Sequence, residues 1–226
     1  TGALTQRQAA LALRQRLAVK RPADADAQHA LAAGYDSVGD ILEQQGDTTR
    51  ALALYRKSLA IAATLVALDP GDLGRQHDLS ASHDNVASVL ETQGDLAAAL
   101  AEYRAGEVIA KQLVAADPSD DHRRDLAVSE LRIGNVLAEQ SDSAAALASL
   151  RASFAIHEAL AAKDPDNADR QRDLTVGYEA IGDVLVATGD TAGGLEQYRK
   201  SLAIGEALVA RDPSNAGWQR DLSLSY

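Results

Sequence analysis

Residues 170–213 read RQRDLTVGYEAIGDVLVATGDTAGGLEQYRKSLAIGEALVARDP, and the remainder of the 226-residue chain consists of copies of this stretch or parts of one. Three dipeptide markers recur in phase, with 47 or 48 residues between successive copies. They are Asp-Pro at Asp69-Pro70, Asp117-Pro118, Asp164-Pro165 and Asp212-Pro213; Asp-Leu at Asp78-Leu79, Asp125-Leu126, Asp173-Leu174 and Asp221-Leu222; and Gly-Asp or Ser-Asp at Gly46-Asp47, Gly94-Asp95, Ser141-Asp142 and Gly189-Asp190. Three markers in phase over four copies indicate a solenoid, in which each repeat packs against its neighbours.

The markers also set the repeat boundaries. We expect a single solenoid over residues 1–226, whose four full repeats, numbered first to fourth, are residues 23–70, 71–118, 119–165 and 166–213. Residues 1–22 align with the second half of a repeat, and residues 214–226 align with the beginning of one.

Each repeat carries two apolar stripes with helical spacing. In the first half of the fourth repeat, Leu174, Tyr178, Ile181 and Leu185 follow one another at steps of 4, 3 and 4 residues. This spacing places them on one face of a helix. The second half repeats the pattern with Leu195, Tyr198, Leu202 and Leu208. Each repeat is therefore predicted to be an antiparallel pair of helices of about 20 residues each.

Residues between the stripes explain where the helices begin and end. Glycine reaches the left-handed conformation that ends a helix at little cost, and the Asp after it can accept a hydrogen bond at the start of the next helix. The residue before a proline disfavours the helical region, so each Asp-Pro marker ends the second helix. We expect nine helical segments, counting the partial repeats, and no strand.

Composition restricts the function. Hydrophobic residues make up 46% of the chain and aromatic residues 4%, which predicts a core of Ala, Leu, Val and Ile. The net charge of −11 disfavours sequence-independent binding of nucleic acid, which depends on neutralising phosphates. Cysteine is absent, so neither disulfides nor thiolate metal sites are expected. Uninterrupted apolar runs are only a few residues long, far short of the ~20 that span a bilayer.

Small and aromatic residues recur where the two helices of a repeat would cross. In the fourth repeat they are Gly182, Gly194, Tyr198 and Ser201, and this run resembles the Gly…Ala…Tyr/Phe…Ala signature of the tetratricopeptide repeat. The resemblance implies an all-α, right-handed superhelical solenoid of antiparallel helix pairs. The usual period of that family is 34 residues. The longer period here adds about two turns to each helix and is similar to long bacterial repeats and to the elongated repeats of kinesin light chain. Arginine outnumbers lysine by 17 to 5, as is typical of proteins from GC-rich bacterial genomes.

No catalytic or cofactor-binding motif is recognisable. The five histidines lack zinc-ligand spacing, and no nucleophile elbow or phosphate-binding loop is found. His29 and His77 are equivalent positions of neighbouring repeats, so a shared metal site is one interpretation, but solvated or hydrogen-bonded side chains are favoured. We expect no metal, no cofactor and no enzymatic activity.

The resemblance places a partner-binding site on a concave groove lined by the first helices of the repeats. The groove positions are Asp36, Asp40, Glu43, Asp84, Ser88, Glu91, Asn135, Glu139, Glu179 and Asp183, with Leu131 among them in the third repeat. Seven residues before four of these positions lie basic side chains, His29, His77, Arg124 and Arg172. These charges either contact a ligand or pair between neighbouring repeats, and pairing between repeats is the favoured alternative. A subset of the family holds a C-terminal carboxylate with Lys and Asn, and only Asn135 fits that pattern.

The resulting expectation is a non-catalytic scaffold that binds a protein or peptide, with a preference for a basic or mixed-charge ligand and no binding to nucleic acid or membrane. Two alternatives remain: a regulatory or sensor arm of a larger bacterial signalling enzyme, and a self-assembly module that associates weakly end to end. No targeting signal is recognisable, and a cytoplasmic location is the expectation.

Overall fold

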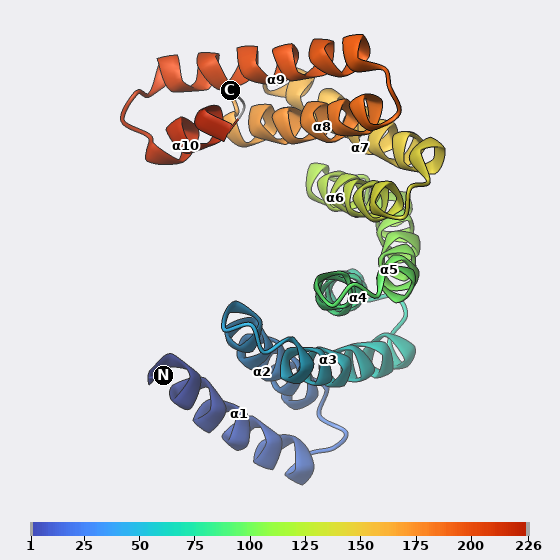
Figure 1. The fold of residues 1–226 in the computed structure, drawn as a ribbon. Coiled ribbons are helices and arrows are strands. Elements are labelled where there is room, and N and C mark those ends of the chain that lie inside the picture. The colour runs from blue at the N-terminus through green and yellow to red at the C-terminus, as the bar shows by residue number, and fades with distance from the viewer. Residues whose placement is uncertain (1, 225–226) are drawn as a thin grey trace. The chain divides into compact units, whose positions relative to one another are not determined.

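The computed structural model describes residues 2–224 and is helical throughout, without a strand in that range. The helices are α1 (Gly2–Lys20), α2 (Ala25–Gln44), α3 (Thr48–Leu68), α4 (Leu73–Thr92), α5 (Leu96–Ala116), α6 (Asp120–Glu139), α7 (Ser143–Lys163), α8 (Ala168–Ala187), α9 (Thr191–Arg211) and α10 (Ala216–Leu224) (Figure 1). The predicted all-α class is confirmed, but the expected number of nine helices is wrong. Four helix pairs and one flanking helix on each side make ten helices within the described residues.

The four helix pairs are alike in length. The first helices, α2, α4, α6 and α8, have 20 residues each, and the second helices, α3, α5, α7 and α9, have 21. The residues added to the usual period therefore lengthen both helices of a pair, and the contact between the two helices extends along them.

The turn inside each pair forms as its sequence predicts. Gly46, Gly94 and Gly189 have φ angles of 78°, 80° and 92°, and Ser141 takes the same place in the third repeat with φ 64°. The left-handed region is costly for a residue with a β-carbon, so the turn at Ser141 is strained relative to the others. The Asp after each of these residues caps the next helix; Asp190, for example, accepts a hydrogen bond from the Gly193 amide at 2.9 Å.

Small residues bring the paired helices close together. A β-carbon added at Gly182 would lie 2.7 Å from Cε1 of Tyr198, and one added at Gly194 would lie 2.9 Å from the carbonyl oxygen of Gly182. The equivalent Tyr55 is buried against Gly39 in the first repeat. Glycine therefore leaves room for an aromatic ring between the two helices, which confirms the predicted crossing.

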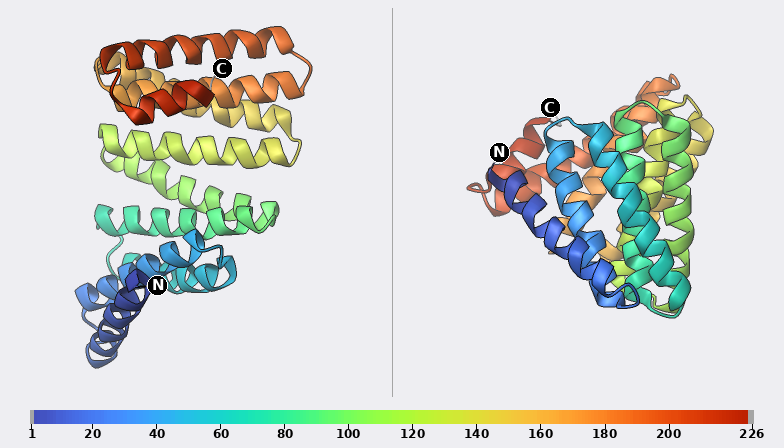
Figure 2. Two further views of the ribbon diagram at one scale, coloured as in Figure 1. Left: turned by 60° about the vertical axis from the view of Figure 1, so that its left-hand side comes forward. Right: turned by 90° about the horizontal axis from the view of Figure 1, so that it is seen from below.

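The chain divides into two compact units, residues 1–117 and 118–226. In the first unit, α3 packs against both α2 and α4. In the second unit, α7 packs against α6 and α8, and α9 packs against α8 and α10; α8 and α9 lie side by side, orange to red, in the left view of Figure 2. The division falls within one residue of a predicted repeat boundary, and a single solenoid over the whole chain stays a prediction.

Helix α3 is the one helix of residues 2–224 that is long and apolar enough to span a membrane, judged by length and composition alone. The sequence reading considered only uninterrupted apolar runs and missed this property, since Arg56 and Lys57 divide the run. One such helix is weak evidence for a membrane segment, and α3 packs against both α2 and α4 in the first unit.

Candidate functional site

Tyrosines from the second helices hold carboxylates on the first helices. The hydroxyl of Tyr55 lies 2.8 Å from both Asp40 Oδ1 and Glu43 Oε2, and that of Tyr103 lies 2.8 Å from Glu91 Oε2. In the fourth repeat, the hydroxyl of Tyr198 donates to Asp183 Oδ1 at 2.6 Å. Burial, assisted by the hydrogen bond to Asp183, raises the pKa of Tyr198 to about 12, so the phenol stays protonated as a donor.

Serines on the second helices hold the carboxylates at a neighbouring position. Ser58 Oγ donates to Asp36 Oδ2 at 2.7 Å, and Ser201 Oγ donates to Glu179 Oε1 at the same distance. Burial raises the pKa of Asp36 to about 6, although the hydrogen bond from Ser58 opposes the shift. The second oxygen, Asp36 Oδ1, is buried and has no hydrogen-bond partner.

Three of the four predicted basic positions, His29, Arg124 and Arg172, pair with aspartates of the next repeat. His29 Nδ1 lies 3.2 Å from Asp78 Oδ2 in the first unit. In the second unit, Arg172 Nε lies 2.7 Å from Asp221 Oδ2. These partners belong to the recurring Asp-Leu marker, which the sequence reading used only to measure the period. The side chains of Arg172 and His29 are about half exposed, so each pair adds little stability.

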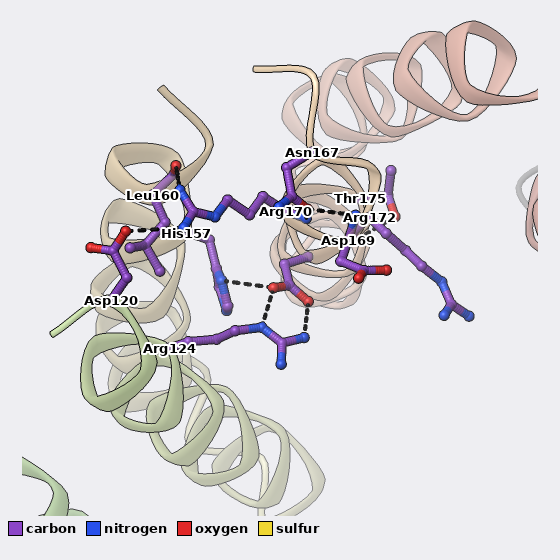
Figure 3. Close-up of polar contacts among 10 residues, drawn as sticks. Asp120, Arg124, His157, Leu160, Asn167, Asp169, Arg170, Arg172 and Thr175 are labelled. Carbon is purple, nitrogen blue, oxygen red and sulfur yellow. Dashed lines mark hydrogen bonds and ion pairs between the residues drawn. The ribbon is translucent and has the colours of Figure 1, made fainter. Parts of the chain in front are cut away.

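The third member of this series, in the second unit, has an additional partner. Arg124 donates two hydrogen bonds to Asp173, with Nε–Oδ2 at 2.7 Å and Nη2–Oδ1 at 2.9 Å (Figure 3). His157 of α7 is only 4% exposed, and its Nδ1 lies 3.6 Å from Asp173 Oδ2. Burial lowers the pKa of His157, against the attraction of Asp173, so the imidazole is neutral at physiological pH. Sequence reading examined this histidine only for metal-ligand spacing.

A second polar cluster, next to this one, links α6, α7 and α8 through hydrogen bonds. Arg170 donates to the carbonyl oxygen of Leu160 at 2.8 Å and to Asp120 Oδ2 at 3.0 Å (Figure 3). Lys163 also donates to Asp120, and both cations lower the pKa of that carboxyl, with the hydrogen bond from Lys163 as the larger cause. The cluster connects the third repeat to the start of the fourth.

Two hollows open where the first helices meet the next repeat. The first-repeat hollow has a volume of about 110 Å³ and is lined by α2, α3 and α4, including Asp36, Ser58 and Asp78. The fourth-repeat hollow has a volume of about 120 Å³ and is lined by α8, α9 and α10, including Glu179 and Trp218. Each hollow lies within one unit.

The other predicted groove residues also lie on the first helices of the repeats. Asn135 and Glu139 are exposed on α6, while Ser88 Oγ lies 3.5 Å from Glu43 Oε1. His77 and Asp84 lie on α4. Their role in ligand binding therefore stays a prediction. Within residues 2–224, no group of three or more His, Asp or Glu side chains is arranged to hold a metal ion.

Comparison with known proteins agrees with the fold of paired helices. Residues 31–69 match the model of the tetratricopeptide repeat family. The fold is similar to BtubC (BKLC) from P. vanneervenii, with a TM-score of 0.71, 16% sequence identity, and coverage of 99% of this chain and 78% of that one. It is also similar to the MamA RS-1 ArsTM double mutant, with a TM-score of 0.50, 15% identity, and coverage of 90% and 88% respectively. No curated protein matches the sequence.

Proposed function

Because this chain is a repeat protein of the tetratricopeptide type, we propose that it is a non-catalytic scaffold that binds a protein or peptide along its first helices. The observation that supports a binding role is the way the acidic side chains are held. Asp40 and Asp183 accept hydrogen bonds from tyrosines of the second helices and remain exposed to solvent. A side chain that is already held in place loses less conformational entropy when a ligand binds.

The charge of these helices favours a basic or mixed-charge ligand. In the first unit, Asp36, Asp40, Glu43 and Glu91 place carboxylates on α2 and α4. Of the basic side chains on the same helices, His29 is paired with Asp78, Arg75 with Asp72 and His83 with Glu102. The remaining negative charge attracts a cationic peptide, and salt screens that attraction.

A peptide-array screen tests the proposal. Asp40→Asn combined with Asp183→Asn removes two exposed charges and keeps an oxygen that can accept the tyrosine hydrogen bonds. We expect the double variant to lose preference for basic peptides, and wild-type binding to weaken as salt rises from about 0.05 to 0.5 M.

Glu158→Gln, an exposed position on the second helix α7, is the matched control and should leave the bound set unchanged. If the double variant binds the same peptides as the wild type at every salt concentration, the first-helix carboxylates do not select the ligand. The proposed function then fails for this surface.

A further inference from the structure

We propose that the first-repeat and fourth-repeat hollows are binding sites for a primary ammonium group, such as the end of a lysine side chain or of a small alkylamine. The inference refines the proposed function, because Asp36 and Glu179 belong to the same acidic helices. It rests on the proposed function only because it concerns the same helices. A free amine can test it without any peptide ligand.

The two hollows are the same site in two repeats. Nine lining positions match at a spacing of 143 residues, among them His29 and Arg172, Asp36 and Glu179, Ser58 and Ser201, Ala62 and Gly205, Leu65 and Leu208, and Asp78 and Asp221. In both, a serine of the second helix donates to the carboxylate of the first helix at 2.7 Å. In both, the basic residue is paired with the aspartate on the first helix of the next repeat. A recurring arrangement of this kind is a property of the repeat rather than a local packing defect.

The carboxylate of the first-repeat hollow lacks a counter-charge. Ser58 occupies one oxygen of Asp36, and Oδ1 is buried without a partner. The nearby basic side chains are engaged elsewhere, because Arg75 Nε lies 3.1 Å from Asp72 and His29 is paired with Asp78. An ammonium group that enters the hollow, and toward which the Asp36 carboxylate turns, supplies the hydrogen bond that no side chain of the protein gives to Oδ1.

The free acceptor suits an ammonium group better than a guanidinium group. A guanidinium binds a carboxylate through two parallel hydrogen bonds and needs both oxygens, whereas an ammonium is a point charge that can use one. Ala32, Ala62 and Leu65 form apolar walls suited to methylene groups. Ser82 and Asn85 line the same hollow and offer further oxygen acceptors for the remaining N–H groups.

The size of the hollow agrees with this ligand. Its volume of about 110 Å³ is several times the ~15 Å³ that a single water molecule requires. An ammonium group with its adjacent methylene groups can therefore enter in place of water. An ammonium group that displaces water from the hollow can itself donate hydrogen bonds to Asp36, so the carboxylate does not lose a donor.

The fourth-repeat hollow adds an aromatic wall. Trp218 stands where the first-repeat hollow has Arg75, so a positive side chain is replaced by an indole. Tryptophan is the side chain whose ring face attracts cations most strongly. Glu179 and Trp218 thus place a carboxylate and an aromatic side chain in the lining of one small hollow, a combination suited to an alkylammonium ion.

The third repeat has the same fold without this site. Leu131 stands at the position of Asp36, and His157 stands at the position of Ala62. The imidazole is buried next to Asp173, which is the equivalent of Asp78 (Figure 3). Ser153, the equivalent of Ser58, has a buried hydroxyl oxygen with no hydrogen-bond partner, because no carboxylate is present to accept from it. Since the helices pack without the carboxylate, packing alone does not account for Asp36 and Glu179.

Titration with n-butylammonium chloride at constant ionic strength tests the proposal on the full chain. At about pH 8, Asp36, whose pKa is about 6, is ionised and the amine is protonated. Trp218 is the single tryptophan, so its fluorescence follows the fourth-repeat hollow, while ¹³C-methyl resonances of Ala32 and Ala62 follow the first. We expect saturable changes in both signals. Glu179→Gln should weaken only the fluorescence response and Asp36→Asn only the methyl response, each by about tenfold.

Three controls separate the possible outcomes. Potassium chloride tests for a general salt effect, n-butylguanidinium tests for the planar cation, and Asp26→Asn repeats the Asp36 substitution at an exposed position of α2. Blocked peptides with one lysine or one acetyl-lysine show whether a peptide side chain supplies the ammonium group. Equal responses to potassium and butylammonium, or unchanged responses in both hollow variants, overturn the proposal. Such a result leaves the peptide-array result standing, so the two proposals fail separately.

Discussion

The first-repeat hollow and its counterpart in the third repeat differ in content although the helices around them are arranged alike. Between α2, α3 and α4, Asp36 faces a hollow beside Ala62. Between α6, α7 and α8, the equivalent positions hold Leu131 and the buried imidazole of His157. Both arrangements keep a polar contact to the first helix of the next repeat, His29–Asp78 in one and Arg124–Asp173 in the other.

The difference shows which contacts the fold requires. The leucines at equivalent positions, Leu65 and Leu160, are 4% and 2% exposed, and the alanines Ala32 and Ala127 are also buried in both repeats. These apolar residues join neighbouring repeats, and burial of apolar surface is the main source of stability at such a junction. The carboxylate and the hollow can be replaced without changing the helices, which is the behaviour of a functional feature carried by a structural repeat.

The largest expected effect comes from giving the third repeat the side chains that line the first-repeat hollow. Leu131→Asp with His157→Ala should create a hollow with a carboxylate next to Ser153, whose hydroxyl then gains an acceptor. Removing the buried imidazole and the half-buried leucine should lower the free energy of unfolding by about 2–4 kcal/mol. The same variant should acquire n-butylammonium binding, detected at the methyl group of Ala127. His157→Ala alone is the control, since it opens space without a carboxylate; equal amine responses in the two variants would contradict the assigned role of the carboxylate.

A smaller effect is expected from neutralising the first-repeat carboxylate. The pKa of Asp36 is about 6 in the folded chain and 3.8 in the unfolded reference, so the folded state binds the proton more tightly. Its ionisation therefore costs stability as pH rises from about 4 through 6, and the cost is fully present above that range. Asp36→Asn should stabilise the chain by about 1–2 kcal/mol near pH 7, after allowance for solvent screening, and by little near pH 4.

Chemical denaturation of the wild type and this variant at both pH values measures the difference. The groups around Asp36 are Ser58 on α3, Asp78 on α4, and Asp40 and His29 on α2. Asp26→Asn, on the exposed first turn of the same helix, should not reproduce the pH-dependent gain. A gain that is equal at both pH values would show that the titration of Asp36 is not its cause.

The reverse conversion should have a modest effect on stability and a clear effect on binding. Ala62→His places in the first repeat the side chain that fills the third, next to Asp36 and Asp78. We expect the amine response at the methyl of Ala32 to disappear and the free energy of unfolding to rise by about 1 kcal/mol through buried area and a new hydrogen bond. Ala63→His, the next residue on the exposed face of α3, should change neither. Loss of stability by more than about 2 kcal/mol would mean that the first-repeat hollow cannot hold an imidazole.

The smallest expected effect concerns the other peculiarity of the third repeat, its turn. Ser141 has a φ angle of 64°, where the equivalent turns of the other repeats have glycine. Ser141→Gly should raise the free energy of unfolding by about 0.5–1 kcal/mol, because glycine adopts this conformation without steric cost. Gly189→Ser should shift the denaturation midpoint in the opposite direction. Shifts of the same sign would show that the turn conformation does not account for the difference between these repeats.

Much of the helix arrangement follows from local sequence signals. The Gly-Asp marker predicts the turn within a pair, and Asp190 caps α9 as expected. Gly182 predicts the close crossing at which the ring of Tyr198 packs. These features depend on residues a few positions apart, or on one helix pair, so periodicity reveals them. The expected count of nine helices was a miscount, since four pairs and one partial-repeat helix on each side give the ten helices found in residues 2–224.

The candidate site was less accessible to sequence reading. The groove positions were placed on the first helices by resemblance, but their hydrogen bonds to Tyr55, Tyr198 and Ser58 were not foreseen. The significance of His157 was also missed. A signal was present in the sequence, since this residue replaces the small residues found at the equivalent position of the other repeats, Ala62, Ala110 and Gly205.

The sequence by itself determined the period, the helix pairs, the caps and the positions of the acidic residues, because each depends on neighbours within a few turns of one helix pair. Only the tertiary structure decided that Asp36 has one satisfied and one unsatisfied oxygen, and that the equivalent place in the third repeat is filled by His157. Those properties depend on the space left between three helices from two successive repeats. That space depends on how the side chains of all three helices pack together, so it cannot be predicted from the spacing of residues along the chain.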